Sequence, residues 1–289
     1  MAKPAENLSI APGERRATIA SRTIAQGRDW QIADIVCRAG PNDSPYEERH
    51  SRMSISAVVA GAFRYRAEHG EALLYPGALL LGNAGTCFEC GHEHGHGDRC
   101  LAVHIDPDLF DEVAASAAGS HRFRFAAASL PAMPELLPPL VELEAMTEAA
   151  RPLAAGSLVV RLVERVGEAM SGAKLAPKTP GRGDARRIGT VLRHIEANAD
   201  GPLDLDRLAT RANMSKYHFL RTFRRVTGTT PYQFVLSLRM RRAAVRLATS
   251  TDPVAAIAYD AGFGDLSTFN SRFRDVFGAS PTKFREKAA

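Results

Sequence analysis

The sequence lacks any run of about 18 apolar residues, the length that a helix needs to cross a membrane. It has four cysteines among 289 residues, too few for a disulfide scaffold in a chain of this length. The first residues, MAKPAENLSIAPGERR, carry charges with no apolar core after them, so we expect no signal peptide. These absences argue against a membrane-spanning helix and predict a cytoplasmic protein with reduced thiols.

Charge is unevenly distributed along the chain. Residues 181–289 hold 19 Lys and Arg against 10 Asp and Glu, whereas residues 1–180 hold 18 against 22. A basic C-terminal part indicates a polyanionic partner, and a solvated basic surface without a partner is the alternative.

A segment near the C-terminus occurs twice, fifty residues apart and without a gap. Two Phe at i and i+4 share one helical face, Gly stands where a C-cap needs a positive φ, and Pro opens the next helix. A short apolar helix precedes each copy, so each copy predicts a helix-turn-helix. The identical pairs are Phe219 and Phe269, Phe223 and Phe273, Arg224 and Arg274, Val226 and Val276, Gly228 and Gly278, Pro231 and Pro281, and Phe234 and Phe284.

The predicted fold is multidomain. We expect a loose arm over 1–20, a mostly-β sensor and dimerisation domain over 21–170, a linker over 171–184 and an all-α domain over 185–289. Short β-like runs from 32 to 105 predict an antiparallel barrel or sandwich, with trailing helices over 107–118 and 134–170. The apolar stripe of 134–170 predicts core packing or a helix pair that forms a homodimer. The C-terminal helices are predicted at 185–198, 204–211, 215–226, 231–249, 253–260, 266–276 and 281–287.

The C-terminal hundred residues resemble the tandem helix-turn-helix domain of the AraC/XylS transcription regulators. The shared motifs are Leu208-Ala-x-x-Ala212, Ser215-x-x-x-Phe219-x-x-x-Phe223-Arg-Arg-x-x-Gly228, Arg239-Met-Arg-Arg-Ala-x-x-Leu247, Ile257-Ala258-x-x-x-Gly262-Phe263 and Ser280-Pro281-x-x-Phe284-Arg285. The N-terminal region resembles the cupin-like sensor domain of such regulators, through Gly61-x-Phe63-x-Tyr65 and Pro76-Gly77-x-x-Leu80-Leu81-x-Asn83. A cupin metal site is not expected, because the segment where the upstream ligand motif would lie offers only His50, and Leu79, Leu80 and Leu81 occupy the strand after Pro76-Gly77.

The resemblance implies two recognition helices joined by a long central helix. It places Tyr217, Leu220 and Arg221 at base-reading positions, and an arginine fork suits guanine. The predicted DNA-facing side chains are Lys216, Tyr217, Leu220, Arg221, Arg224 and Arg225 in the first helix and Ser267, Thr268, Asn270, Ser271 and Arg272 in the second. Four arginines of the central helix, Arg239, Arg241, Arg242 and Arg246, are predicted to contact phosphates or to form internal salt bridges.

A second pattern gathers cysteine and histidine over residues 87–100. At the strand period of two, Cys90, His92, His94 and His96 share one face. Thiolate and imidazole suit Zn(II), Cu(I) or Ni(II), and Cys-x-x-Cys is a common half of a zinc site. The candidate ligands are Cys87, Cys90, His92, His94, His96 and Cys100. Redox sensing by Cys87 or Cys90, and a structural or ligand-pocket role without metal, are the alternatives.

The function implied is a sequence-specific, one-component transcription regulator, not an enzyme. The expected partners are double-stranded DNA, RNA polymerase for an activator, a small-molecule or metal effector and a second copy of the chain. The alternative is a metal- or redox-dependent sensor or repair regulator that uses residues 87–100. A cupin-type metalloenzyme and a methyl-accepting repair regulator are disfavoured, because the upstream histidine pair and a second close cysteine pair are missing.

Overall fold

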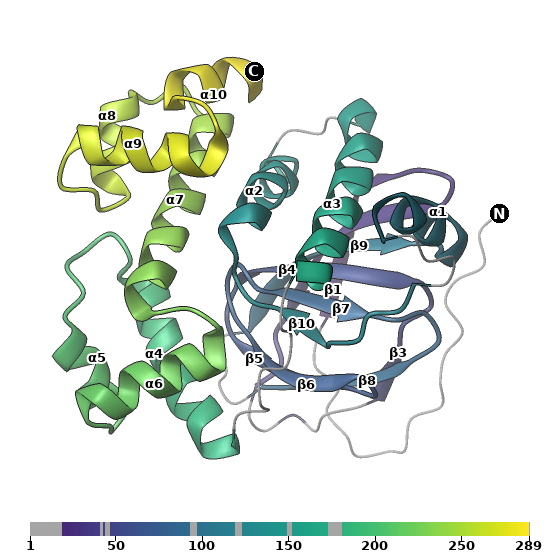
Figure 1. Cartoon of the computed structure of the whole chain (residues 1–289), viewed down its shortest axis with the longest axis horizontal. Coiled ribbons are helices and arrows are strands. Elements are labelled where there is room, and N and C mark those ends of the chain that lie inside the picture. The colour runs from purple at the N-terminus through teal and green to yellow at the C-terminus, as the bar shows by residue number, and fades with distance from the viewer. Residues whose placement is uncertain are drawn as a thin grey trace.

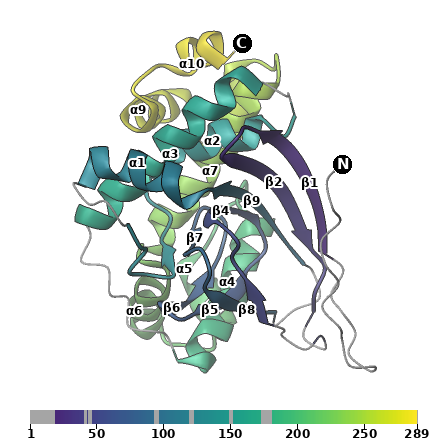
Figure 2. The same cartoon turned by 90° about the vertical axis from the view of Figure 1, so that its right-hand side faces the viewer.

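The computed structural model describes residues 19–40, 43, 47–92, 97–118, 123–148, 152–172 and 181–288. Two antiparallel sheets lie face to face, helices cover the outer face of the larger sheet, and an all-helical domain lies beside them (Figure 1). The turned view shows the covering helices on one side of the larger sheet and the smaller sheet on the other (Figure 2). The multidomain prediction, with a cupin-like β domain before a helix-turn-helix domain, is confirmed.

The larger sheet has the strand order β1-β2-β9-β4-β7-β10. Its strands are β1 (Ile19–Gln26), β2 (Trp30–Cys37), β4 (Met53–Ala60), β7 (Leu79–Gly82), β9 (Asp98–Ile105) and β10 (Ser129–Leu130). Strand β1 includes the last two residues of the predicted arm, and residues 1–18 lie outside the described residues.

The smaller sheet has the order β3-β8-β5-β6. Its strands are β3 (Glu47–Arg49), β5 (Phe63–Ala67), β6 (Gly70–Leu74) and β8 (Cys87–Gly91). The period of two divides the larger sheet's side chains between two environments. In β4, Ile55 and Ala57 join the core under the covering helices, whereas Ser54 and Ser56 line a cavity between the sheets.

The covering helices are α1 (Pro107–Ala118), a 3₁₀ turn η1 (Pro134–Leu136), α2 (Leu137–Ala145) and α3 (Pro152–Gly172). The apolar stripe predicted over 134–170 is buried within the single chain, since Leu140, Leu158 and Leu162 belong to the sheet–helix core. Core packing therefore accounts for the stripe, and it no longer indicates a dimer surface.

The helical domain has seven helices among its described residues, close to their predicted bounds. They are α4 (Arg182–Ala197), α5 (Leu205–Arg211), α6 (Lys216–Thr227), α7 (Pro231–Thr249), α8 (Val254–Asp260), α9 (Leu266–Phe277) and α10 (Pro281–Ala288). Helix α8 begins one residue later than predicted, because Pro253 is its N-cap and not its first helical residue. Of the predicted linker, residues 173–180 lie outside the described residues.

The helical domain packs directly against the β domain. The Tyr75 hydroxyl donates to the carbonyl of Thr227, and the Tyr75 ring meets Phe234 edge-on at 5.5 Å between centroids. Arg241 of α7, only 5% exposed, donates to the carbonyls of Val58 and Val59 at 3.2 and 2.8 Å. One apolar core is thus shared by the smaller sheet and the first helix-turn-helix.

Candidate DNA interface and effector pocket

Helix α6 is the second helix of the first helix-turn-helix. The Ser215 hydroxyl accepts from a backbone N–H of its first turn, and Gly228 ends the helix at φ +74°, a conformation that favours glycine. Phe219 and Phe223 are fully buried and fix which face looks outward. All six predicted side chains of this helix are exposed: Lys216, Tyr217, Leu220, Arg221, Arg224 and Arg225.

These outward side chains differ in what they already contact. Lys216 pairs with Asp206 at 2.7 Å, and Arg225 pairs with Asp184. The side chains of Arg221 and Arg224 form no hydrogen bond or ion pair within the described part of the chain. Tyr217 is 76% exposed, which is unusual for a ring of this size without a partner. The face around Arg221 therefore keeps its donors available for a ligand.

Helix α9 repeats this construction fifty residues later. The Asp265 carboxylate accepts from Thr268 N–H at 2.7 Å, and Gly278 ends the helix at φ +69°. Phe269 and Phe273 are fully buried, like their counterparts in α6. Of the predicted side chains, Asn270 is half-buried and the other four are exposed: Ser267, Thr268, Ser271 and Arg272.

The four arginines of α7 bind groups within the chain. Arg239 donates to the carbonyls of Ala199, Gly201 and Gly262 at 2.6 to 2.7 Å. Arg246 pairs with Asp252 and Asp260, Arg242 donates to the carbonyl of Glu196, and Arg241 reaches the β domain. Internal salt bridges, the second of the two predicted roles, describe Arg241 and Arg246, whereas Arg239 and Arg242 donate to backbone carbonyls instead.

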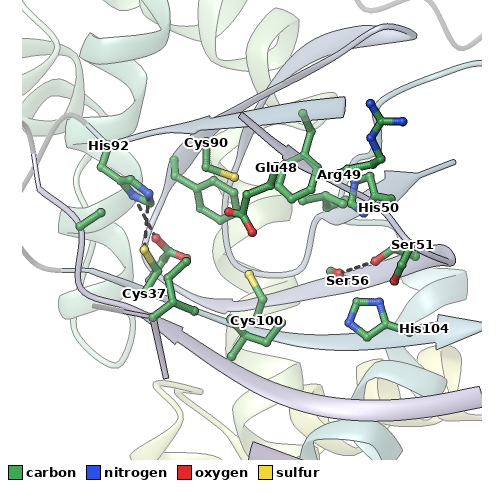
Figure 3. A pocket seen from close by; sticks show the side chains of 18 of the residues that line it. Cys37, Glu48, Arg49, His50, Ser51, Ser56, Cys90, His92, Cys100 and His104 are labelled. Atoms are coloured by element: carbon green, nitrogen blue, oxygen red, sulfur yellow. Dashed lines mark hydrogen bonds and ion pairs between the residues drawn. The ribbon is translucent and has the colours of Figure 1, made fainter. Parts of the chain in front are cut away.

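A cavity of about 280 Å³ lies between the two sheets. Figure 3 shows side chains from both sheets pointing into it. Its apolar lining includes Ile35, Phe63, Leu80 and Phe88, and its polar lining includes Glu48, His50, Ser54, Ser56 and His104. A small, mostly apolar cavity with a few convergent polar groups is typical of a ligand site.

The structure divides the predicted metal ligands. Because β8 alternates its faces, Cys90 and His92 line the cavity, whereas Cys87, three residues before Cys90, does not. The Cys-x-x-Cys pair therefore does not converge as half of a zinc site. Cys100 lines the cavity from β9, and His94 and His96 lie outside the described residues.

His92 instead lies between Cys37 and Asp98. Its Nε2 is 3.6 Å from the Cys37 sulfur, and its Nδ1 is 3.1 Å from a carboxylate oxygen of Asp98 (Figure 3). Burial lowers the pKa of His92, but the interactions with Asp98 and Cys37 outweigh it and raise this pKa to about 9. These three residues also form a group of donors compact enough to hold a metal ion.

The net pKa shifts of His50 and His104 are opposite to that of His92, because burial dominates both. Desolvation lowers the pKa of His50 to about 4, and the charges of His104 and His69 lower it further. The ring is neutral at pH 7, stacks on Phe88 at 4.1 Å and lies 2.9 Å from the Tyr65 hydroxyl. This side of the cavity therefore offers a neutral imidazole.

The sequence pattern over 87–100 missed Cys37 and Asp98. They are paired residues of the neighbouring strands β2 and β9, sixty-one positions apart in the chain. Composition and local spacing do not reveal strand register, so Cys37 stood alone in the sequence. The Asp98 carboxylate lies six residues after His92, but Glu89 and Glu93 are nearer in the sequence, so local spacing did not single out Asp98 as its partner.

Similarity to known proteins covers both domains. Residues 208–287 match the family described as helix-turn-helix domain, and residues 36–163 match the AraC-like ligand binding domain. None of the described helices is both long and apolar enough to span a membrane.

Individual relatives resemble the C-terminal third. The multiple antibiotic resistance protein MarA of Escherichia coli K12 is 33% identical over 102 residues, which are 35% of this chain and 80% of MarA. The regulatory protein SoxS of Salmonella typhimurium is 34% identical over 100 residues, 35% of this chain and 94% of SoxS. The DNA-binding domain of the global transcriptional factor AdpA, solved with a target DNA, is 31% identical with a TM-score of 0.34, covering 35% of this chain and 91% of that domain. With its two capped helix-turn-helix units and a ligand-binding β domain, the chain belongs to the AraC/XylS family of DNA-binding transcription regulators.

Proposed function

We propose that α6 and α9 read base edges in two successive major grooves, and that the cavity between the sheets binds the effector. The proposed base reading is supported by two features that α6 and α9 share. Each helix is capped at both ends, and each buries a Phe pair so that its polar side chains face outward. The two helix-turn-helix units lie at the two ends of α7 (Figure 1). With its 19 residues, α7 is about 28 Å long, and with its flanking turns it spans about one turn of B-DNA.

Within α6, contacts inside the chain separate two classes of cation. Lys216 and Arg225 already pair with aspartates, so they suit phosphate contacts at the rim. The side chains of Arg221 and Arg224 have no such partner among the described residues, and Arg221 stands one residue after Leu220, near the middle of the exposed face. Arg221 is therefore the base-reading arginine, and Leu220 supports it by apolar contact with a thymine methyl.

The effector would act through the contact between the two domains. Cys37 and Asp98 line the cavity on one side and, on the other, a groove that faces α4. In that groove the Gly61 N–H donates to the Glu196 carboxylate of α4 at 3.3 Å. A ligand that moves this edge of the β domain changes the position of the helical domain, which requires a free-energy difference of only a few kcal/mol between states.

We also infer the partners that the family implies. Target DNA places the protein in the cytoplasm, and activation would add a contact with RNA polymerase. A homodimer stays a prediction that needs a surface other than the buried 134–170 stripe, and sedimentation at several concentrations tests it.

Replacement of Arg221 tests the DNA interface. Arg221→Ala should cost about 1–3 kcal/mol of binding to the selected DNA site and relax its sequence preference. Arg165→Ala is the matched control, because Arg165 is an exposed arginine of α3 that pairs with Glu168. Binding is measured by titration against the site selected from a random library and against its single-base variants. An equal loss on every sequence, with a smaller salt dependence, would make Arg221 a phosphate contact and contradict the base-reading role.

A further inference from the structure

The Cys37, His92 and Asp98 cluster is arranged as a nucleophile, a base and an orienting acid. The imidazole has one nitrogen 3.6 Å from the sulfur and the other 3.1 Å from the carboxylate. His92 and Asp98 side chains are 7% and 6% exposed, so water competes little for either. A thiol beside an imidazole that a third group holds in place has the geometry of an activated sulfur nucleophile.

The cavity limits which molecules reach this sulfur. Its volume of about 280 Å³ equals the space of roughly nine water molecules in the liquid. Ile35, Leu80 and Phe88 in its lining favour an apolar body over a strongly hydrated oxidant. All four cysteines are free thiols, and the group beside the Cys37 sulfur is an imidazole rather than a second thiol. The cluster thus suits addition to one thiol rather than disulfide formation.

We propose that Cys37 reacts covalently with small apolar electrophiles of the α,β-unsaturated carbonyl class, with His92 as its acid–base partner and Asp98 as the residue that positions His92. In the reactive form of the pair the thiol proton already lies on His92 Nε2, and the thiolate sulfur bonds to the β-carbon. The electron pair of the carbon–carbon double bond moves toward the carbonyl as an enolate. His92 then returns the proton to the α-carbon, so atoms balance and no oxidant is required.

The adduct site is connected to the DNA-binding domain by backbone packing. A β-carbon on Gly97 would lie 2.4 Å from the Cys37 carbonyl oxygen, and one on Gly61 would lie 2.5 Å from the Gly97 carbonyl oxygen. Both glycines have positive φ, and Gly61 donates to Glu196 of α4. An adduct that displaces the Cys37 backbone therefore also displaces Gly97 and Gly61, and through them the hydrogen bond to Glu196 of α4. This regulatory consequence rests on the proposed function, whereas the reactivity of Cys37 does not.

The test is alkylation of the full-length, reduced protein with limiting N-ethylmaleimide, followed by peptide mass spectrometry. Cys37 should be modified at least about tenfold faster than Cys87, which lies outside the cavity and serves as an internal reference. In His92→Gln and Asp98→Asn the Cys37 rate should fall by about tenfold while the Cys87 rate stays unchanged. Loss of structure would instead raise the rates of Cys90 and Cys100, so folding and activation are distinguishable.

Three outcomes would overturn the assignment. Faster modification of Cys87 in the wild type is one, and this comparison needs no variant to fold. An unchanged Cys37 rate in both variants is the second. The third is a stoichiometric metal ion in the purified protein that shields Cys37 until a chelator removes it, because the cluster is then a metal site. DNA affinity is measured separately on the Cys37 adduct: an unchanged affinity would contradict the proposed coupling and leave the thiol chemistry standing.

Discussion

At the scale of single residues, burial and partners give two cavity histidines, His92 and His50, different charge states at neutral pH. His92 faces a carboxylate, whereas His50 faces Phe88 and a tyrosine hydroxyl. Two imidazoles in one cavity therefore hold different protonation states at neutral pH, one able to donate from both nitrogens and one able to accept.

His50 makes stability depend on pH in a defined direction. The unfolded chain binds a proton at His50 near pH 6.5, but the folded chain does so only near pH 4. The contribution of His50 to the free energy of unfolding is therefore fully present above pH 6.5. It is lost as pH falls toward 4, by up to about 3 kcal/mol. Urea denaturation at pH 7, 6 and 5 measures this loss. His50→Gln should reduce this loss, leaving the part due to His104, whose pKa burial also lowers, and the opposite contribution of His92, whose pKa is raised. The same slope in wild type and variant would show that His50 is not responsible.

At the scale of elements, the helices were predictable because their ends are set by adjacent residues. Thr230 and Gln233 form a capping box on either side of Pro231, and Gly228 ends the preceding helix. These residues all lie within six positions. The sheet contacts were not predictable to the same degree. Cys37 meets Asp98, and Tyr75 meets Thr227, 152 positions away, through register and domain packing that no local pattern encodes.

The two C-cap glycines provide a matched pair for the repeat. A β-carbon at Gly278 has open space. Gly278→Ala should therefore lower the free energy of unfolding only by the cost of placing alanine in the left-handed conformation, about 1–2 kcal/mol. A β-carbon at Gly228 would lie 3.0 Å from Pro131 of the β domain, so Gly228→Ala should cost more. Urea unfolding of both variants measures the difference. Equal losses would mean that Pro131 yields without cost and that the domain contact at Gly228 is loose.

At the scale of the whole molecule, the two domains share one core and a buried arginine. Arg241→Met removes the donors for the Val58 and Val59 carbonyls and should destabilise the chain by about 2–4 kcal/mol. It should also separate unfolding of the two domains into two transitions in calorimetry. Arg242→Met is the control, because Arg242 is exposed and its side chain donates within its own domain, to the Glu196 carbonyl. A single unshifted transition in Arg241→Met would show that the domains are held together by other contacts.

The internal pairing of all four α7 arginines has a consequence for the DNA target. Arg239 fixes α7 to the loops before α5 and α9, and Arg241 fixes the same helix to the β domain. Under the proposed DNA contact, the interval between α6 and α9 is thus a constant of the fold rather than a variable that an effector adjusts. Evolution of a new operator spacing would require replacement of the central helix, whereas evolution of a new operator sequence requires only changes on the exposed faces of α6 and α9.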